Sequence, residues 1–323
     1  MYDDRVIYRD GIPFIPVTFP ANRPDGIIIE DLQIQQLIDY VNKNNLKKAY
    51  IQNVHNYEFL KECIGLEHIR LQLRLPFSDY GDLQKKGERY IKVYDVDALY
   101  SLVNLKSLEI IDTENPIITS KMSVDLSRFS KLEYYSGEYG YICNLGQAKH
   151  LKFISFSHYK KADLSELRDL EQLDTIEMVQ SGLCSLDGCE RLKKLQCLYL
   201  HYNRRLSDIS ALREVKDSLR ALRIENCPKI KDFSVLGELE NLELLELTGS
   251  NELPNLDFIK TMKNLKTFTF TMNVLDGDLS PCLNLSYVYS EKNRKHYNIK
   301  DAMLPKNAYV RGNEDIEEWR RRE

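Results

Sequence analysis

Cysteine and histidine are the side chains of this 323-residue chain that could support nucleophilic catalysis. Cys197 and His201 come nearest to a catalytic pair, because alternate residues of a strand share one face and a histidine can take the proton of a thiol. Such catalysis also needs a group that orients the histidine and an oxyanion hole. The sequence around this pair offers neither, so an enzyme stays an alternative to a binding protein without enzymatic activity.

Motifs for metals and cofactors are missing from the sequence. Cys184 and Cys189 could form a disulfide or bind a metal, but zinc sites use a second cysteine pair or a histidine motif, and none lies nearby. The chain has no P-loop, no Gly-x-Gly-x-x-Gly after a strand, no His-Glu-x-x-His and no Gly-x-Ser-x-Gly. We expect neither a metal nor a cofactor.

The elements that must position any site follow a repeated phrase: Leu, two residues, an apolar residue, one residue and another apolar residue. It begins at Leu173, Leu195, Leu219, Leu242 and Leu265, so the starts lie 22 to 24 residues apart. Alternate side chains of a strand point to opposite faces, so the last two apolar positions of each phrase point to one side. A single repeat cannot bury this row, but stacked repeats bury it together beneath a parallel sheet.

Polar residues follow each phrase at a fixed offset, three positions after its last apolar residue. This series consists of Thr113, Ser181, Asn203, Cys227, Ser250, Asn273 and Asn293. Their side chains can satisfy backbone groups where the chain leaves each strand. The alternative is that polar residues simply follow strands, as turns demand.

Weaker phrases extend the array in both directions, to starts at residues 46, 66, 88, 105, 132, 151 and 285. Glu88 stands in for the first leucine of one of them. The steps of 17 and 27 residues around Leu105 predict a short repeat followed by an inserted loop that begins at Asn115-Pro116. Segments such as Leu206–Leu212, with the sequence Asp-Ile-Ser inside, predict short turns and 3₁₀ segments between the strands.

These features resemble the internalin-type, short-repeat bacterial leucine-rich repeat proteins, over residues 46–293 and most specifically from Leu195 to Asn273. The resemblance implies an α/β-class leucine-rich repeat solenoid, with a curved parallel β-sheet on the concave side and short turns or 3₁₀ segments on the convex side. It also implies that the concave sheet binds another protein. Surface-exposed members of that family carry an export signal and a cell-wall anchor, and this sequence shows neither.

The ends of such an array need caps, because a terminal repeat would expose its core. We expect residues 1–45 to form an N-terminal cap, a hairpin around Asp10-Gly11 followed by a helix from about Glu30 to Asn44. A small functional domain is the alternative, but 45 residues are few for an independent core. Residues 46–293 form the array of about 12 repeats, and residues 294–323 form a C-terminal cap and charged tail.

Composition limits the partners. The net charge is −4, whereas proteins that bind nucleic acid carry basic patches, so we expect no nucleic-acid partner. No apolar run approaches the roughly 18 residues of a membrane span, and we expect no membrane contact. The seven cysteines are odd in number and scattered, which favours free thiols and a cytoplasmic protein. A secreted protein whose export signal lies outside this sequence is the alternative.

The residues that flank the inward pair of each phrase should face outward on the concave sheet. We predict that the protein-binding residues are Tyr90, Tyr94, Glu109, Tyr134, Phe153, Glu177, Tyr199, His201, Arg223, Glu246, Tyr287 and Tyr289. Tyrosine and arginine are common in interface hot spots. Charge also changes along this face, from Lys48, Arg70 and Lys92 to glutamates further on. The alternative is that strands favour tyrosine in any case and that solvated faces carry charge.

The favoured function is a protein-binding scaffold: an adaptor, an inhibitor or an immunity-type protein. The second hypothesis is a secreted effector or surface adhesin of internalin type that binds a host protein. We expect a monomer or a weak homodimer, because edge strands at poorly capped ends can pair. The sequence does not name the partner.

Overall fold

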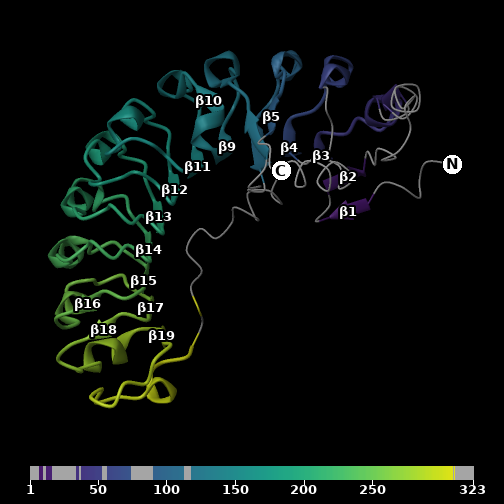
Figure 1. The fold of residues 1–323 in the computed structure, drawn as a ribbon. Helices are drawn as coiled ribbons and strands as arrows, with labels where there is room; N and C mark the ends of the chain where they lie inside the picture. Colours follow the sequence, from purple (N-terminus) through teal and green to yellow (C-terminus); the bar gives the residue numbers. More distant parts are fainter. Residues whose placement is uncertain are drawn as a thin grey trace. The chain divides into compact units, whose positions relative to one another are not determined.

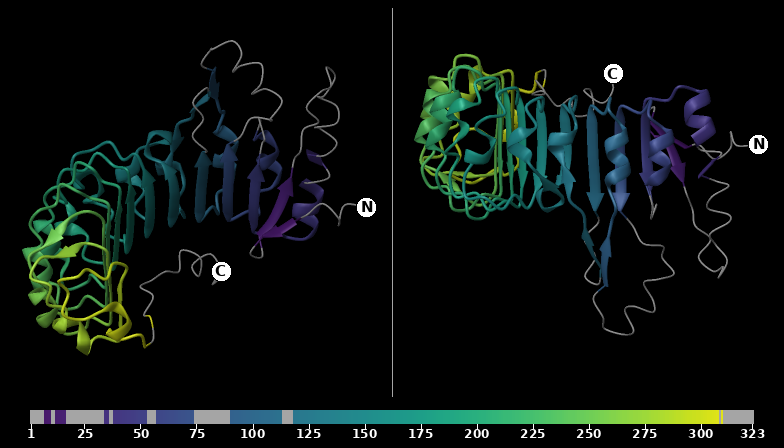
Figure 2. Two further views of the ribbon diagram at one scale, coloured as in Figure 1. Left: turned by 60° about the horizontal axis from the view of Figure 1, so that its bottom comes forward. Right: turned by 90° about the horizontal axis from the view of Figure 1, so that it is seen from above.

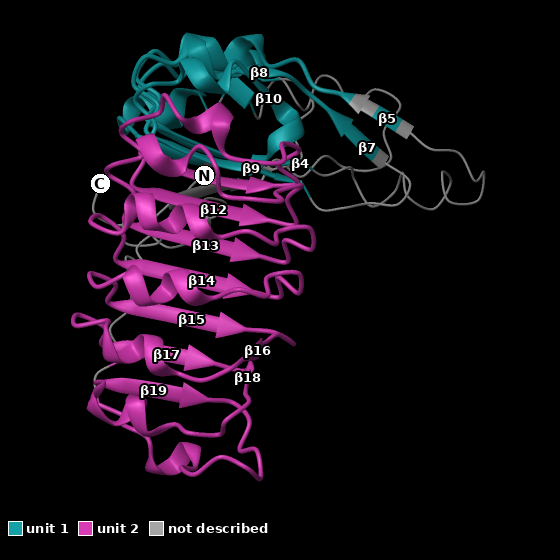
Figure 3. Ribbon diagram, turned by 90° about the vertical axis from the view of Figure 1, so that its left-hand side faces the viewer, with its two compact units in different colours: residues 1–151 teal, residues 152–323 magenta. Residues whose placement is uncertain are grey.

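The computed structural model describes residues 7–9, 12–16, 34–35, 38–52, 57–73, 90–112, 118–307 and 309. It divides into two compact units, Met1–Leu151 and Lys152–Glu323, and each is described by itself (Figure 3). Thr113, the predicted loop start at Asn115-Pro116 and the tail beyond Tyr309 lie outside the described residues.

Unit 2 is built on a parallel sheet whose strands pair in the order of the sequence (Figure 1). The strands are β11 (Phe153–Ser157), β12 (Thr175–Val179), β13 (Cys197–His201), β14 (Ala221–Glu225), β15 (Leu244–Thr248), β17 (Thr267–Phe270) and β19 (Tyr287–Ser290). Leu198, Leu222 and Leu245 pair directly with one another across three strands, and each is at most 1% exposed. The repeated phrase therefore forms equivalent, neighbouring strands over one shared apolar core, as predicted.

Short 3₁₀ segments carry the chain back between the strands of unit 2, on the other side of the core (Figure 2). They are η6 (Ser165–Leu167), η7 (Cys189–Arg191), η8 (Ser210–Val215), η9 (Ser234–Glu238), η10 (Asp257–Lys260) and η11 (Ser280–Asn284), and a further segment, η12 (Asp301–Met303), follows the last strand. Asp208 and Asp232 each accept the backbone N–H of the serine two residues later, at 2.8 Å. This bond holds the pKa of the Asp208 carboxyl below its usual range. The prediction of a tight turn at Asp-Ile-Ser is confirmed.

The polar series after the strands is confirmed at Asn203 and Asn293, where the side chain accepts a backbone N–H, and it is wrong at Ser250. Asn203 is fully buried; its side chain accepts the N–H of Ser181 at 2.7 Å and donates to the carbonyl of Met178 at 3.0 Å. Ser250 is exposed, and its neighbour Asn251 is buried instead, where it donates to the carbonyls of Cys227 and Ile230. The prediction for Ser250 was wrong by one residue.

The last strand of unit 2 is covered by the chain that follows it. Lys306 forms an antiparallel bridge with Tyr287, and the N–H of Val288 donates to the carbonyl of Pro305 at 2.9 Å. Leu304 beside them is 3% exposed. These bonds occupy the edge of β19, which would otherwise present unpaired backbone groups.

In unit 1 the strands of the main sheet follow the order β1, β2, β3, β4, β6, β9. Its strands are β1 (Ile7–Arg9), β2 (Ile12–Pro16), β3 (Lys48–Gln52), β4 (His68–Leu73), β6 (Ser107–Asp112) and β9 (Tyr134–Glu138). β1 and β2 are antiparallel, and β2 pairs with β3. Residues 38–43 are helical, within the predicted N-terminal helix. The 3₁₀ segments are η1 (Glu58–Glu62), η2 (Asp97–Ser101), η3 (Leu126–Arg128), η4 (Tyr139–Tyr141) and η5 (Leu145–Gln147).

The phrase that begins at Glu88 does not join this sheet, which corrects the predicted position of Tyr90 and Tyr94. β5 (Tyr90–Val93) pairs with β7 (Ile118–Lys121) away from the main strands, and β4 pairs directly with β6 (Figure 3). Ile91 and Val93, predicted to point inward, are 51% and 73% exposed. Seventeen residues to Leu105 are too few for a full coil of about 22 residues, so this strand pairs elsewhere.

Candidate protein-binding face

We call the face of each main sheet that points away from the 3₁₀ segments the concave face. In unit 2 its side chains form rows that run across the strands, because directly paired residues share a face. The first row consists of Phe153, Thr175, Cys197, Ala221, Leu244, Thr267 and Tyr287. The middle row consists of Ser155, Glu177, Tyr199, Arg223, Glu246, Thr269 and Tyr289.

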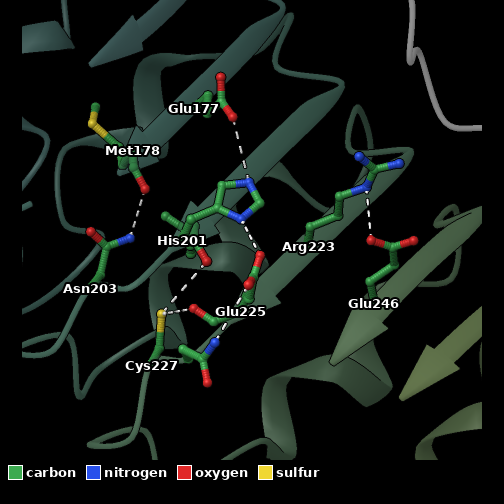
Figure 4. A network of polar contacts seen from close by, with 10 residues as sticks. Glu177, Met178, His201, Asn203, Arg223, Glu225, Cys227 and Glu246 are labelled. Atoms are coloured by element: carbon green, nitrogen blue, oxygen red, sulfur yellow. Dashed lines mark hydrogen bonds and ion pairs between the residues drawn. The ribbon is translucent and has the colours of Figure 1, made fainter. Parts of the chain in front are cut away.

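His201, the last residue of β13, lies between Glu177 of β12 and Glu225 of β14 (Figure 4). Its Nδ1 is 2.9 Å from a carboxylate oxygen of Glu225, and its Nε2 is 3.6 Å from one of Glu177. Glu177 also accepts the hydroxyl of Ser155 at 2.7 Å. Burial alone would raise the pKa of Glu225, but hydrogen bonds from His201 and Tyr202 outweigh burial and hold this pKa below its usual range.

A second charged group lies beside the first. Arg223 Nε is 3.0 Å from a carboxylate oxygen of Glu246 (Figure 4). Its guanidinium carbon lies 4.8 Å from the centre of the Tyr199 ring. The other carboxylate oxygen of Glu246 accepts the hydroxyl of Tyr309 at 2.8 Å. Glu246 therefore contacts both the guanidinium group of Arg223 on the same face and the hydroxyl of Tyr309 from the C-terminal segment.

Tyr309 covers an apolar cluster on this face. The cluster, which we call the tyrosine pocket, consists of Cys197, Tyr199, Ala221 and Leu244, each at most 2% exposed. The Tyr309 ring also meets the Tyr287 ring edge-on, with centroids 5.1 Å apart and planes at 88°. Small side chains at Cys197 and Ala221 separate the bulkier Phe153 and Leu244 in the first row, which leaves room for an incoming ring.

The concave face of unit 1 carries Arg70 and Glu109, which form an ion pair between β4 and β6. The charges on the concave faces are partly neutralised by ion pairs. Arg70 and Arg223 each form an ion pair with a glutamate of the neighbouring strand. His68, half-buried at the start of β4, has its pKa lowered to about 4 by burial and by Lys48 and Lys106.

Several predicted aromatic residues do lie on the concave faces, but most of them are not exposed. Tyr134, Phe153 and Tyr199 are 1%, 7% and 2% exposed, Tyr287 is half-buried, and Tyr289 is 44% exposed. Adjacent strands lie about 4.8 Å apart, so neighbours in a row cover much of each ring. Tyr94 is buried at a different place, where it stacks on Tyr57. The binding role of all these residues stays a prediction.

The sequence reasoning missed Tyr309 as a residue of this face. It placed Tyr309 in a C-terminal cap, and no local pattern connects it with Glu246, which lies 63 residues earlier. The one available signal was the combination of small residues at Cys197 and Ala221 in an otherwise bulky row.

The structure gives Cys197 and His201 different surroundings: the thiol lies in the apolar pocket, whereas the imidazole contacts carboxylates. Cys184 and Cys189 are both free thiols, and each donates to a backbone carbonyl. Within the part of the chain that the structure describes, no group of three or more His, Cys, Asp or Glu could hold a metal ion. Among the same residues, no helix is long and apolar enough to cross a membrane.

No protein-family model matches the chain, and no curated protein matches it in sequence. Solved structures resemble it. An internalin (inlF) from Listeria monocytogenes has 18% identity and a TM-score of 0.47, over 72% of this chain and 69% of the internalin. A leucine-rich repeat protein of Leptospira interrogans has 17% identity and a TM-score of 0.49, over 82% and 59%. TLR13 in its complex with ssRNA13 has 18% identity and a TM-score of 0.50, over 79% and 44%.

Low identity limits these likenesses to the fold, and they agree with the geometry of the described strands: equivalent repeats, a parallel sheet and short 3₁₀ returns. The described strands and 3₁₀ segments therefore have the fold of a leucine-rich repeat solenoid, a fold that the TLR13 structure shares.

Proposed function

We propose that this protein is a scaffold without enzymatic activity that binds a protein partner on the concave face of unit 2. The observation that carries the proposal is Tyr309, because the face already holds an aromatic side chain from a distant segment, with apolar contacts and a hydrogen bond. Buried aromatic anchors that keep a polar contact are typical of protein interfaces.

The charges of the concave face of unit 2 favour a protein over a nucleic acid as the binding partner. TLR13, whose fold is similar, is described in complex with an RNA. Here the concave face of unit 2 carries the carboxylates of Glu177, Glu225 and Glu246, which would repel a phosphate backbone. Their pairing with His201 and Arg223 leaves a mixed polar surface that suits the rim of a protein interface.

For the finer role, we propose an adaptor, inhibitor or immunity-type protein of the cytoplasm. A repeat array that presents a long sheet face is suited to hold a partner rather than to transform a substrate. The free thiols support a reducing compartment, and five of them, at Cys63, Cys189, Cys197, Cys227 and Cys282, are buried.

A site-specific photo-crosslinking experiment tests the proposal. A photoreactive amino acid replaces Thr269, a half-buried residue of the middle row, and the protein is illuminated in cells of its source. We expect a covalent adduct with one defined protein, identified by mass spectrometry. The matched control carries the same amino acid at Lys216, an exposed residue at the end of η8.

The two positions give opposite expectations. Adducts that form at Thr269 and not at Lys216 support the concave face as the binding surface. The same adducts at both positions, or adducts at Lys216 alone, would contradict it.

A further inference from the structure

The contacts of Tyr309 describe a binding site for one kind of side chain. Its ring lies against Cys197, Tyr199, Ala221 and Leu244, and its hydroxyl donates to Glu246. Phenylalanine would fill the same apolar space but would leave this carboxylate oxygen of Glu246 without its donor. A phosphotyrosine would bring two negative charges against Glu246. The chemistry of the site therefore favours an unmodified tyrosine.

The residues that line the tyrosine pocket all belong to the sheet and not to the segment that carries Tyr309. Its walls come from β13, β14 and β15, whose backbones are fixed by their parallel pairing. Arg223 holds Glu246 from the opposite side to the phenol and stacks on Tyr199. These contacts hold the acceptor and one wall in place, so the site is preorganised for a phenol.

The segment that brings Tyr309 is anchored separately. Before Tyr309, the carbonyl of Pro305 accepts the N–H of Val288, Lys306 bridges to Tyr287, and the N–H of Asn307 donates to the carbonyl of Ser286. The fold of the last strand thus depends on residues 304–307, and Tyr309 can leave the pocket without loss of that cap. A ligand attached by so short a link acts at an effective concentration of the order of millimolar.

We propose that the tyrosine pocket is a recognition site for a tyrosine side chain in an extended segment of the partner, and that Tyr309 occupies it as an internal competitor in the free protein. The inference rests on the proposed function of the concave face. Binding then requires the partner to displace Tyr309, so the C-terminal segment lowers the apparent affinity and restricts binding to partners that supply an equivalent phenol.

The test measures how fast iodoacetamide alkylates Cys197, a wall of the pocket that is 1% exposed beneath Tyr309. We expect alkylation in Tyr309→Ala to be at least about tenfold faster than in the wild type, because removal of the ring opens the thiol to solvent. Tyr309→Phe keeps the ring and is the matched control, with a rate within about threefold of the wild type. Peptide mapping by mass spectrometry separates Cys197 from Cys227, which is fully buried in the repeat interior.

The second arm adds a synthetic peptide with the sequence of residues 305–312 to Tyr309→Ala. We expect millimolar peptide to slow the alkylation of Cys197 again. The peptide with phenylalanine in place of tyrosine should protect less, and the phosphotyrosine and alanine peptides should not protect.

Each other result overturns the proposal. Equal alkylation of Cys197 in the wild type and Tyr309→Ala would show that Tyr309 does not cover the pocket. Faster alkylation of Cys227 as well would show that Tyr309 belongs to the folded core. Equal protection by all four peptides would remove the preference for a phenol. None of these results changes the crosslinking at Thr269, so failure of this inference is distinguishable from failure of the proposed function.

Discussion

Asn251 and Ser250 are adjacent, and only Asn251 is buried. The cause lies two residues before Asn251. Tyr202 and Asn226, at the equivalent position of earlier repeats, have φ near 50°, whereas Gly249 has φ of 135°. The different turn delays the inward side chain by one residue, so Asn251 takes the place that Cys227 holds in the preceding repeat.

The buried side chain of Asn251 contributes to the stability of the fold. Asn251→Ala removes the donors to two buried backbone carbonyls, and we expect the free energy of unfolding to fall by about 2 kcal/mol. Ser250→Ala changes an exposed side chain and should cost less than about 0.5 kcal/mol. Urea unfolding of the two variants measures the difference. A larger loss for Ser250→Ala would mean that the polar series follows the register expected from sequence spacing alone.

His68 makes stability depend on pH. Its pKa is about 4 in the folded protein and 6.5 in the unfolded chain, so both states are neutral above pH 6.5. Between pH 6.5 and 4 only the unfolded state binds the proton, and stability falls as the pH falls. Since His68 is half exposed, we expect this loss to be of the order of 1 kcal/mol.

The variant His68→Gln isolates this effect, because glutamine does not titrate. Urea unfolding at pH 7 and pH 4.5 should show a smaller loss of stability in His68→Gln than in the wild type. Parallel losses in the two proteins would show that the histidine is as easily protonated in the folded state as in water.

At the scale of the elements, some of the turns between coils require glycine, and Gly188 is one of these positions. Gly188 has φ of 97°, and a Cβ there would lie 2.4 Å from the backbone nitrogen of Ser165 in the preceding coil. Because residue 188 has no Cβ, the two coils can pack at the distance that the pairing of their strands sets.

Gly188→Ala should therefore lower the free energy of unfolding by about 2 kcal/mol or more, through backbone strain and the steric clash. Gly237→Ala is the control, because its Cβ would meet Thr261 Oγ1 at an ordinary 3.6 Å. We expect this variant to be within about 0.5 kcal/mol of the wild type. Similar unfolding curves for the two variants would contradict the close stacking at Gly188.

The elements that sequence predicts well are those whose signal is local and repeated. Each strand of the main sheet in unit 2 follows its own phrase, because burial of two alternate positions is a property of the strand itself. The prediction for β5 was wrong because its pairing does not follow from its local sequence pattern. Ile91 and Val93 have the apolar alternation of a core strand, but the length of the following segment decides where the strand pairs.

At the scale of the whole molecule, the sequence predicts which residues lie on the concave face of unit 2, but not that Tyr309 packs on it. Glu177, His201, Arg223 and Glu246 lie on the concave face of unit 2 as predicted, since their positions follow from the phrase. Tyr309 could not be placed, because its contact with Glu246 joins segments 63 residues apart. The ion pair between Arg70 and Glu109 could not be predicted either, because the sequence placed the strand that follows Glu88 between their two strands.

Under the proposed function, we expect this arrangement to determine how a partner is selected. Paired charges on the face would have to be matched by the partner in the same alternating order, because an unpaired buried charge is costly. Affinity then comes mainly from the buried aromatic contacts, and selectivity comes from the surrounding ion pairs.

The dissociation constant of the partner captured at Thr269 tests the central claim most directly, when measured for the wild type, Glu177→Lys and Glu238→Lys. Glu177 lies on the concave face, whereas Glu238 ends η9 on the other side of the core and pairs with Arg213. We predict at least about tenfold weaker binding for Glu177→Lys and wild-type binding for Glu238→Lys. Equal affinities of all three proteins, or a loss confined to Glu238→Lys, would contradict a concave binding face.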